Sequence, residues 1–266
     1  MPDLLTVSRL DAIATVTLVK PTMPPVFFAE CEQVFRELGG DASLRAVIVR
    51  SSAKAFSYGL DLPAAFQAHG HLFAGGTAAN RADLLRLIKK LQGAFDAIAA
   101  CPVPVIAAVQ GHCIGGGLDL ITACDVRLAT ADATFSLRET KIAIVADLGS
   151  LQRLPLVVGK GHARELAFTG KTIDAARAER IGLVNEVLPT REALDEAALA
   201  MAREIASNPP LTVRGVKDVL DFGEGRSVAE GLAYVATHNS AFLASEDLGE
   251  AIAAFMEKRT PRFQGK

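Results

Sequence analysis

Several absences narrow the function of this chain. Its 266 residues carry 28 Lys and Arg against 30 Asp and Glu, which gives a formal net charge of −2. This balance supplies neither the basic surface of a general nucleic-acid binder nor a polybasic membrane patch. No apolar run is long enough to span a bilayer. We therefore expect neither a nucleic-acid partner nor a membrane partner.

Cysteines are few, and targeting signals are not evident. The 4 cysteines form no Cys-x-x-Cys pair, so we expect buried free thiols in a reducing compartment. The N-terminus lacks a basic segment followed by an apolar core, and the C-terminus is not a Ser-Lys-Leu peroxisomal signal. These features predict a cytoplasmic protein.

Common catalytic and nucleotide-binding signatures are also missing. The chain has no Gly-x-Ser-x-Gly elbow, and its glycine cluster does not read Gly-x-Gly-x-x-Gly. Gly170-Lys-Thr172 matches the end of a P-loop, but Glu165 stands where that loop needs its first glycine. The five histidines show no metal-ligand spacing, so we expect no metal site.

Hydrophobic periodicity predicts alternating strands and helices, followed by helices alone. Strands are expected at 4–8, 12–19, 46–51, 103–109, 126–129, 134–136 and 184–188. Helices are expected at 27–38, 80–100 and 116–123, over most of the chain after Asp147, and throughout from Arg191. Ser227 and Glu230 have the spacing of a capping box, which should begin one of the last helices. The pattern indicates an α/β core with a helical C-terminal region.

The most informative segment is a glycine cluster that follows an apolar run. Val103–Val109 leads to Gly115–Gly117, and Asp119 falls in the first turn of the next predicted helix. Glycines allow close backbone approach, and a helix N-terminus presents unpaired N–H groups. Such a junction can hold an oxyanion beside a carboxylate that moves protons. Alternatively, Asp119 only complements the helix dipole.

A second glycine turn lies in Ala55–Leu62, shortly after a predicted strand. The backbone N–H of Leu60 is positioned in this turn to face a ligand. The alternative interpretation is an ordinary connecting loop, because loops with one glycine are common.

Three acids form the third candidate: Asp119, Glu139 and Asp147. Asp147 lies in the almost wholly apolar run 142–149. Burial and neighbouring carboxylates raise the pKa of a carboxyl group, which suits proton transfer near neutral pH. Alternatively, Asp147 sits in a surface loop and caps the following helix. Asp125 is expected to be structural and to pair with the backbone or with Arg127.

These motifs together resemble the enoyl-CoA hydratase/isomerase (crotonase) superfamily. The resemblance rests on Phe56–Leu62, Pro104–Gly111, Gly115–Asp119 and Cys124–Arg127. It implies a crotonase (ClpP-like) spiral of ββα units over residues 1–195 and a helical trimerisation region over 196–266. It also implies an acyl-CoA thioester substrate, no separate cofactor, and assembly into a homotrimer or hexamer.

Within this superfamily, residues 115–156 are most similar to Δ3,5-Δ2,4-dienoyl-CoA isomerases, which carry acids at the positions of Asp119, Glu139 and Asp147. Typical hydratases carry Glu at the first of these positions and Gly at the third. The resemblance implies that Glu139 and Asp147 transfer protons while Asp119 orients or tunes Glu139. A 2-enoyl-CoA hydratase and a non-catalytic acyl-CoA-binding relative are the alternatives.

The resemblance also assigns the groups that would hold the substrate. The backbone N–H groups of Leu60 and Gly116 would bind the thioester oxygen. The remaining residues expected to line the substrate are Ser57, Tyr58, Gly59, Asp61, Gly115 and Gly117. The segment Val19–Phe28 departs from the family pattern, because it lacks the Asn residues and, apart from Lys20, the basic residues found in relatives.

Overall fold

The computed structural model describes residues 4–73 and 76–266. Its strands are β1 (Leu5–Leu10), β2 (Ile13–Leu18), β3 (Thr22–Met23), β4 (Ala46–Ser51), β5 (Gly59–Leu60), β6 (Val105–Val109), β7 (His112–Ile114), β8 (Val126–Thr130), β9 (Thr134–Ser136), β10 (Ile173–Asp174) and β11 (Glu186–Leu188). They form a six-stranded sheet in the order β1-β2-β4-β6-β8-β11, a three-stranded sheet β10-β9-β7, and the pair β3-β5.

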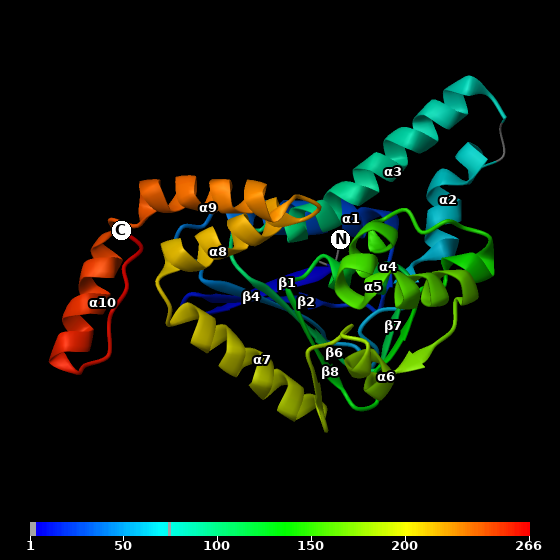
Figure 1. Cartoon of the computed structure of the whole chain (residues 1–266). Helices are drawn as coiled ribbons and strands as arrows, with labels where there is room; N and C mark the ends of the chain where they lie inside the picture. The colour runs from blue at the N-terminus through cyan, green and yellow to red at the C-terminus, as the bar shows by residue number, and fades with distance from the viewer. Residues whose placement is uncertain (1–3, 74–75) are drawn as a thin grey trace.

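Helices cover both faces of the six-stranded sheet. They are α1 (Pro25–Gly39), α2 (Leu62–Phe73), α3 (Ala78–Ala99), α4 (Gly116–Thr122), the 3₁₀ helix η1 (Glu139–Ile142), α5 (Ser150–Thr169), α6 (Ala175–Arg180), α7 (Arg191–Ala206), α8 (Pro210–Gly223), α9 (Val228–Phe242) and α10 (Glu246–Glu257). In Figure 1 the sheet lies between α7 on one side and α1 and α3 on the other.

The central strands β2, β4, β6 and β8 are mainly buried because they are largely apolar on both faces, whereas most of the edge strand β1 is exposed. In β4, Val47 and Val49 join the larger core, whereas Ala46 and Ile48 join a second core with residues of α7. Successive side chains of a strand point to opposite faces, so a parallel strand covered twice reads as a continuous apolar run. This explains why Ala46–Ser51 was recognisable as a buried strand from the sequence.

Most of the longer predicted elements are present. The helix expected at 80–100 is α3, and the strands expected at 46–51 and 134–136 are β4 and β9. The sequence did not predict α2, the 3₁₀ helix η1 or the strands β3, β5, β7 and β10. These four strands have only two or three residues each, which is too short for a reliable periodic signal. The four cysteines are buried and free, as expected.

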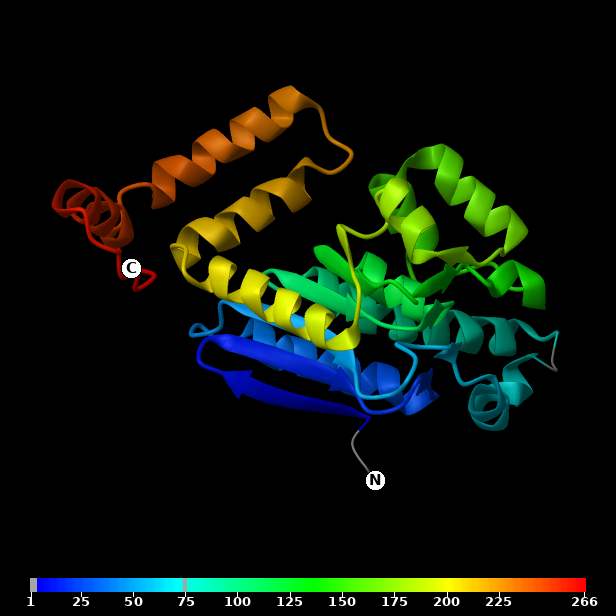
Figure 2. The same cartoon turned by 90° about the horizontal axis from the view of Figure 1, so that it is seen from below.

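The C-terminal helices α8, α9 and α10 extend away from the sheet (Figures 1 and 2). The capping box predicted at Ser227 and Glu230 is present at the start of α9, with both of its reciprocal hydrogen bonds. A boundary between residues 195 and 196 stays a prediction. It would fall inside α7, which packs against the sheet.

An ion pair between the buried Lys217 and the partly exposed Asp125 ties α8 to the sheet. Asp125, directly before β8, accepts hydrogen bonds through Oδ2 from the Val105 N–H and from Lys217 Nζ of α8, both at 2.7 Å. The predicted backbone pairing of Asp125 is therefore present. Arg127 instead donates to backbone carbonyls, among them Cys124 O at 2.7 Å. Lys217 is thus the side-chain partner that the sequence did not reveal.

We predict that Lys217→Met lowers the free energy of unfolding by about 1–3 kcal/mol, because it leaves the Asp125 carboxylate short of a charged hydrogen-bond partner. Urea unfolding measures this change. The double variant Asp125→Asn/Lys217→Met should lose less free energy of unfolding than the two single variants lose in sum, since the residues interact directly. Strict additivity would show that the pair contributes nothing.

Candidate active site

Two glycine loops from distant parts of the sequence meet at the backbone. Gly59, in β5, has a φ of +81°. A Cβ atom added there would lie 2.8 Å from Ile114 O and 2.9 Å from Gly116 N. A side chain at residue 59 would therefore separate the two loops. The glycine turn at Gly59 and the glycine cluster at Gly115–Gly117 are far apart in the sequence but form one site.

The predicted oxyanion donors lie on either side of this contact. Gly116 is the first residue of α4, so its N–H has no partner within the helix. A Cβ added at Gly116 would lie 3.6 Å from Leu60 N. Gly115 precedes the helix with a φ of +54°, and its carbonyl accepts from Leu118 N at 2.7 Å. The geometry places two backbone N–H groups next to each other at a helix N-terminus.

The other predicted lining residues support this contact or lie beside it. Ser57 Oγ accepts a hydrogen bond from Gly59 N at 3.0 Å, and a Cβ added at Gly117 would lie 2.8 Å from Ser57 Cβ. Tyr58 is exposed, and its ring centroid lies 5.6 Å from that of His112. Asp61 Oδ1 accepts from Ala64 N at 3.1 Å in the first turn of α2. Contact of these residues with a substrate stays a prediction.

Asp119 lies in the first turn of α4 and is 1% exposed. Its Oδ1 accepts a hydrogen bond from Ser150 N at 2.7 Å, at the start of α5. Burial raises the pKa of Asp119 to about 6, the charge of Asp147 adds to the rise, and the hydrogen bonding from Ser150 opposes it. Asp119 thus does more than complement the dipole of its own helix: it joins α4 to the beginning of α5.

Glu139 begins η1, and its carboxyl group lies over the glycine cluster. A Cβ added at Gly115 would come within 2.9 Å of Glu139 Oε1. The other oxygen, Oε2, is buried and has no hydrogen-bond partner among the described residues. Burial, followed by the charges of Asp119 and Asp147, raises the pKa of Glu139 to about 7. A carboxyl with this pKa can take or give a proton near neutral pH.

Asp147 lies on the loop between η1 and α5 and is half-buried. Burial raises its pKa, and its charge raises the pKa of both Asp119 and Glu139. The structure therefore brings the three predicted acids together. The alternative that Asp147 caps the next helix is not supported, because the N-cap of α5 is Gly149 and no side chain bonds there.

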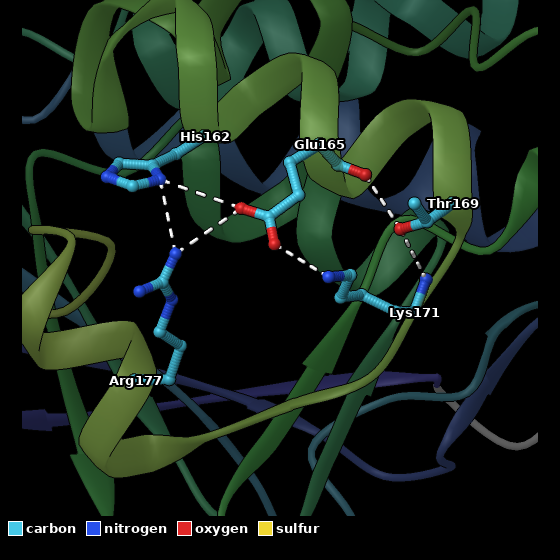
Figure 3. Close-up of polar contacts among 5 residues, drawn as sticks. All are labelled: His162, Glu165, Thr169, Lys171 and Arg177. Atoms are coloured by element: carbon cyan, nitrogen blue, oxygen red, sulfur yellow. Dashed lines mark hydrogen bonds and ion pairs between the residues drawn. The ribbon is translucent and has the colours of Figure 1, made fainter.

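The segment that partly matches a P-loop has a structural role instead. Gly170 ends α5 with a left-handed conformation, and Lys171 Nζ donates to Glu165 Oε1 at 2.6 Å. Arg177 donates to the other Glu165 oxygen at 3.3 Å. Figure 3 shows Glu165 held between these two cations, with His162 beside Arg177. The lysine amine is thus paired with a carboxylate of its own chain.

Comparison with known proteins decides the family. The family model for enoyl-CoA hydratase/isomerase matches residues 9–266. The chain belongs to this family. It is 42% identical over 260 residues to the Delta(3,5)-Delta(2,4)-dienoyl-CoA isomerase, mitochondrial, of Dictyostelium discoideum, covering 95% of this chain and 87% of that one. It is 43% identical over 238 residues to the Delta(3,5)-Delta(2,4)-dienoyl-CoA isomerase, peroxisomal, of Arabidopsis thaliana, covering 89% of this chain and 86% of that one.

The fold of the family is confirmed as well. The crystal structure of enoyl-CoA hydratase from Bacillus anthracis matches with a TM-score of 0.89 and 30% identity, over 99% of this chain and 100% of that one. The α/β crotonase fold predicted from the sequence is therefore present, with α8–α10 as its helical C-terminal part. Within the described parts of the chain, no helix is long and apolar enough to cross a bilayer.

Sequence reasoning missed one buried residue of the site. Ser150 is 0% exposed and is the first residue of α5. Its backbone N–H holds Asp119, as described above. The only signal in the sequence was a Gly-Ser pair after Asp147, and such a pair commonly begins a helix.

We predict that Glu139→Gln stabilises the protein more at pH 8 than at pH 5. The folded protein raises the pKa of Glu139 from 4.5 to about 7, so the folded state binds the proton more tightly than the unfolded chain. Stability from this group is present below the unfolded pKa and is lost as pH rises through about 7. The neutral glutamine avoids that loss, a gain of roughly 1–3 kcal/mol at pH 8.

Urea unfolding at both pH values measures the effect of Glu139→Gln. Glu179→Gln, at an exposed position on α6, serves as the matched control. If Glu139→Gln changed the free energy of unfolding equally at pH 5 and pH 8, burial would not raise the pKa of Glu139.

Proposed function

We propose that the chain is an acyl-CoA isomerase that converts 3,5-dienoyl-CoA to 2,4-dienoyl-CoA. The observation that carries the proposal is the group formed by Asp119, Glu139 and Asp147, three carboxyls with raised pKa beside paired glycine loops. Membership of the family supplies the acyl-CoA substrate class. The relatives named as dienoyl-CoA isomerases, at 42% and 43% identity, support the finer assignment.

In the proposed mechanism the thioester oxygen accepts hydrogen bonds from the N–H groups of Leu60 and Gly116. Removal of a C2 proton moves negative charge onto this oxygen, and each well-placed donor contributes roughly 3 kcal/mol to the transition state. Both donors belong to backbone held by other contacts, so they need little reorganisation as the charge develops. The product of this step is a dienolate.

Two acids are needed because the two reacting carbons lie far apart. Glu139 takes the C2 proton, since its Oε2 has no hydrogen-bond partner within the described part of the chain and can accept one. Asp147 delivers a proton to C6, and the electron pair of the dienolate shifts to give the 2,4-diene. Asp119 keeps the proton affinity of Glu139 high through its charge. Glu139 then releases its proton to solvent and Asp147 takes one up from solvent, which restores the starting state. Coenzyme A stays part of the substrate throughout.

A 2-enoyl-CoA hydratase is the second candidate, favoured by the similarity to the Bacillus anthracis enoyl-CoA hydratase structure. A hydratase must hold one water between two acids. The Asp119 side chain is one methylene shorter than the Glu usual in hydratases. Its Oδ1 already accepts a hydrogen bond from the Ser150 N–H, which leaves it less able to bind a water. These features favour isomerisation. A protein that only binds acyl-CoA is less well supported, because the glycine loops and all three acids are present.

We predict that the wild-type protein raises the near-ultraviolet absorbance of a 3,5-dienoyl-CoA by conjugating its double bonds. Asp147→Asn should lower this rate by about a hundredfold or more, because asparagine cannot supply a proton. Binding of the acyl-CoA should stay within a few-fold of wild type. Full isomerase activity of Asp147→Asn would refute the role of Asp147.

The competing functions are distinguished by absorbance assays with two substrates and by a binding measurement. A decrease in the enoyl absorbance of crotonyl-CoA, with no reaction of the diene, would identify a hydratase. Absence of both reactions with retained acyl-CoA binding would favour the non-catalytic alternative.

We also propose that the chain forms a homotrimer or hexamer through its C-terminal helices. Large apolar side chains are exposed on α9 and α10, namely Val228, Leu232, Phe242, Ile252, Phe255 and Met256. Exposed apolar side chains in this number mark a surface that associates with another protein. A cytoplasmic location stays a prediction, supported by the four buried free thiols.

We predict that Phe255→Asp dissociates the oligomer, because this side chain is 82% exposed in the single chain and would meet a partner subunit. Light scattering measures the mass. Val7→Asp, on strand β1, is the control and should leave the mass unchanged. A monomeric wild-type protein would overturn the proposal.

A further inference from the structure

The main chain around Asp147 has no regular secondary structure of its own. Residues 144–147 belong to neither helix nor strand, between η1 and the start of α5. A single methylene group joins the Asp147 carboxyl to its Cα atom. The path of the main chain at Asp147 therefore decides where the carboxyl lies. Contacts that hold this turn therefore also hold the Asp147 carboxyl, which delivers the proton to C6 in the proposed reaction.

One face of α3 reaches this turn through two side chains. Gln92 Nε2 donates a hydrogen bond to Asp147 O at 2.6 Å. Asp96, one helical turn later on the same face, accepts from Arg153 Nη2 at 2.6 Å. Arg153 Nη1 in turn donates to Leu148 O at 3.4 Å. Two consecutive carbonyl groups of the turn are thus tied to α3, the first directly and the second through Arg153.

Glycine at residue 149 makes this arrangement possible. Gly149 has a φ of +121°, and a Cβ added there would lie 2.0 Å from Arg153 Nη1. Any side chain would displace the guanidinium group from the turn. The next residue, Ser150, donates its N–H to Asp119. The turn is therefore held at two points. Gln92 binds the Asp147 carbonyl, and Asp119 binds the N–H of Ser150, three residues later.

The other two acids are held by different contacts. Asp119 is fixed by α4 and the Ser150 N–H, and Glu139 lies over Gly115 at the start of η1. Gln92 forms its hydrogen bond with the main chain of Asp147. A change at Gln92 thus acts first on Asp147 and leaves the contacts of the proposed C2 base in place.

We propose that Gln92 is a positioning residue that holds the main chain of Asp147, and so places the Asp147 carboxyl at the distal end of the dienoyl chain. The inference rests on the proposed isomerase function. A displacement of about 1 Å at a reacting group can cost on the order of a hundredfold in rate. Loss of the Gln92 hydrogen bond should therefore affect proton delivery at C6 and leave proton removal at C2 largely unchanged.

The test follows both proton transfers in one sample. The full-length protein is incubated with a 3,5-dienoyl-CoA in D2O. Deuterium entering C2 of the unreacted substrate, measured by mass spectrometry, reports the step at Glu139. The rise in near-ultraviolet absorbance reports the whole isomerisation. In Gln92→Met, of similar length but without the donor, we expect isomerisation to fall about ten- to a hundredfold. Exchange at C2 and KM should stay within about threefold of wild type, a difference too small to reflect lost positioning.

Controls separate a local effect from a general loss of structure. Lys90→Met makes the same replacement at an exposed position of α3 and should behave as wild type in both reactions. If Gln92→Met does not fold, Gln92→Glu decides, because it keeps the size of the side chain but lacks the Nε2 donor at neutral pH.

The possible outcomes distinguish this inference from the function on which it rests. Equal losses of C2 exchange and isomerisation in the Gln92 variants, or no loss of either, would overturn the positioning role. A wild-type protein that isomerises no diene would contradict the proposed function itself, whatever the Gln92 variants do.

Discussion

Three carboxyl groups share a partly buried site, and the loss of their hydration is the constraint on which the arrangement of the site depends. Burial removes water from a carboxylate and raises its pKa, and a nearby negative charge raises the pKa further. The effect is visible at Glu139, where burial and the charges of Asp119 and Asp147 raise the pKa to about 7. Such a group can lose and regain a proton at modest cost. The scaffold must hold it there against repulsion.

The scaffold does so with main-chain contacts from separate elements. The loop that follows β4 and the start of α4 meet at Gly59 and Gly116, where only glycine lets the two backbones approach. The start of α5 binds Asp119 through the Ser150 N–H, and α3 holds the turn of Asp147. Each acid therefore depends on a different element, which allows their positions and proton affinities to differ.

The remainder of the chain supports this arrangement from a distance. The central strands of the six-stranded sheet are apolar on both faces, and two of them, β4 and β6, lead into the glycine loops. The Asp125–Lys217 ion pair connects the sheet to α8, from which the apolar α9 and α10 extend. The site with its buried acids and the exposed apolar side chains of α9 and α10 are thus connected through the sheet and its two cores.

The sequence by itself determined the fold class, the glycine motifs and the three acids. Strong local signals carry these features: apolar runs such as Ala46–Ser51, a glycine cluster before a helix, and an acid inside an apolar segment. Only the tertiary structure decided which groups meet. Gln92 and Ser150 have no distinctive local pattern, and the partner of Asp125 proved to be Lys217. Such contacts join residues far apart in the chain, so no periodicity or short motif records them.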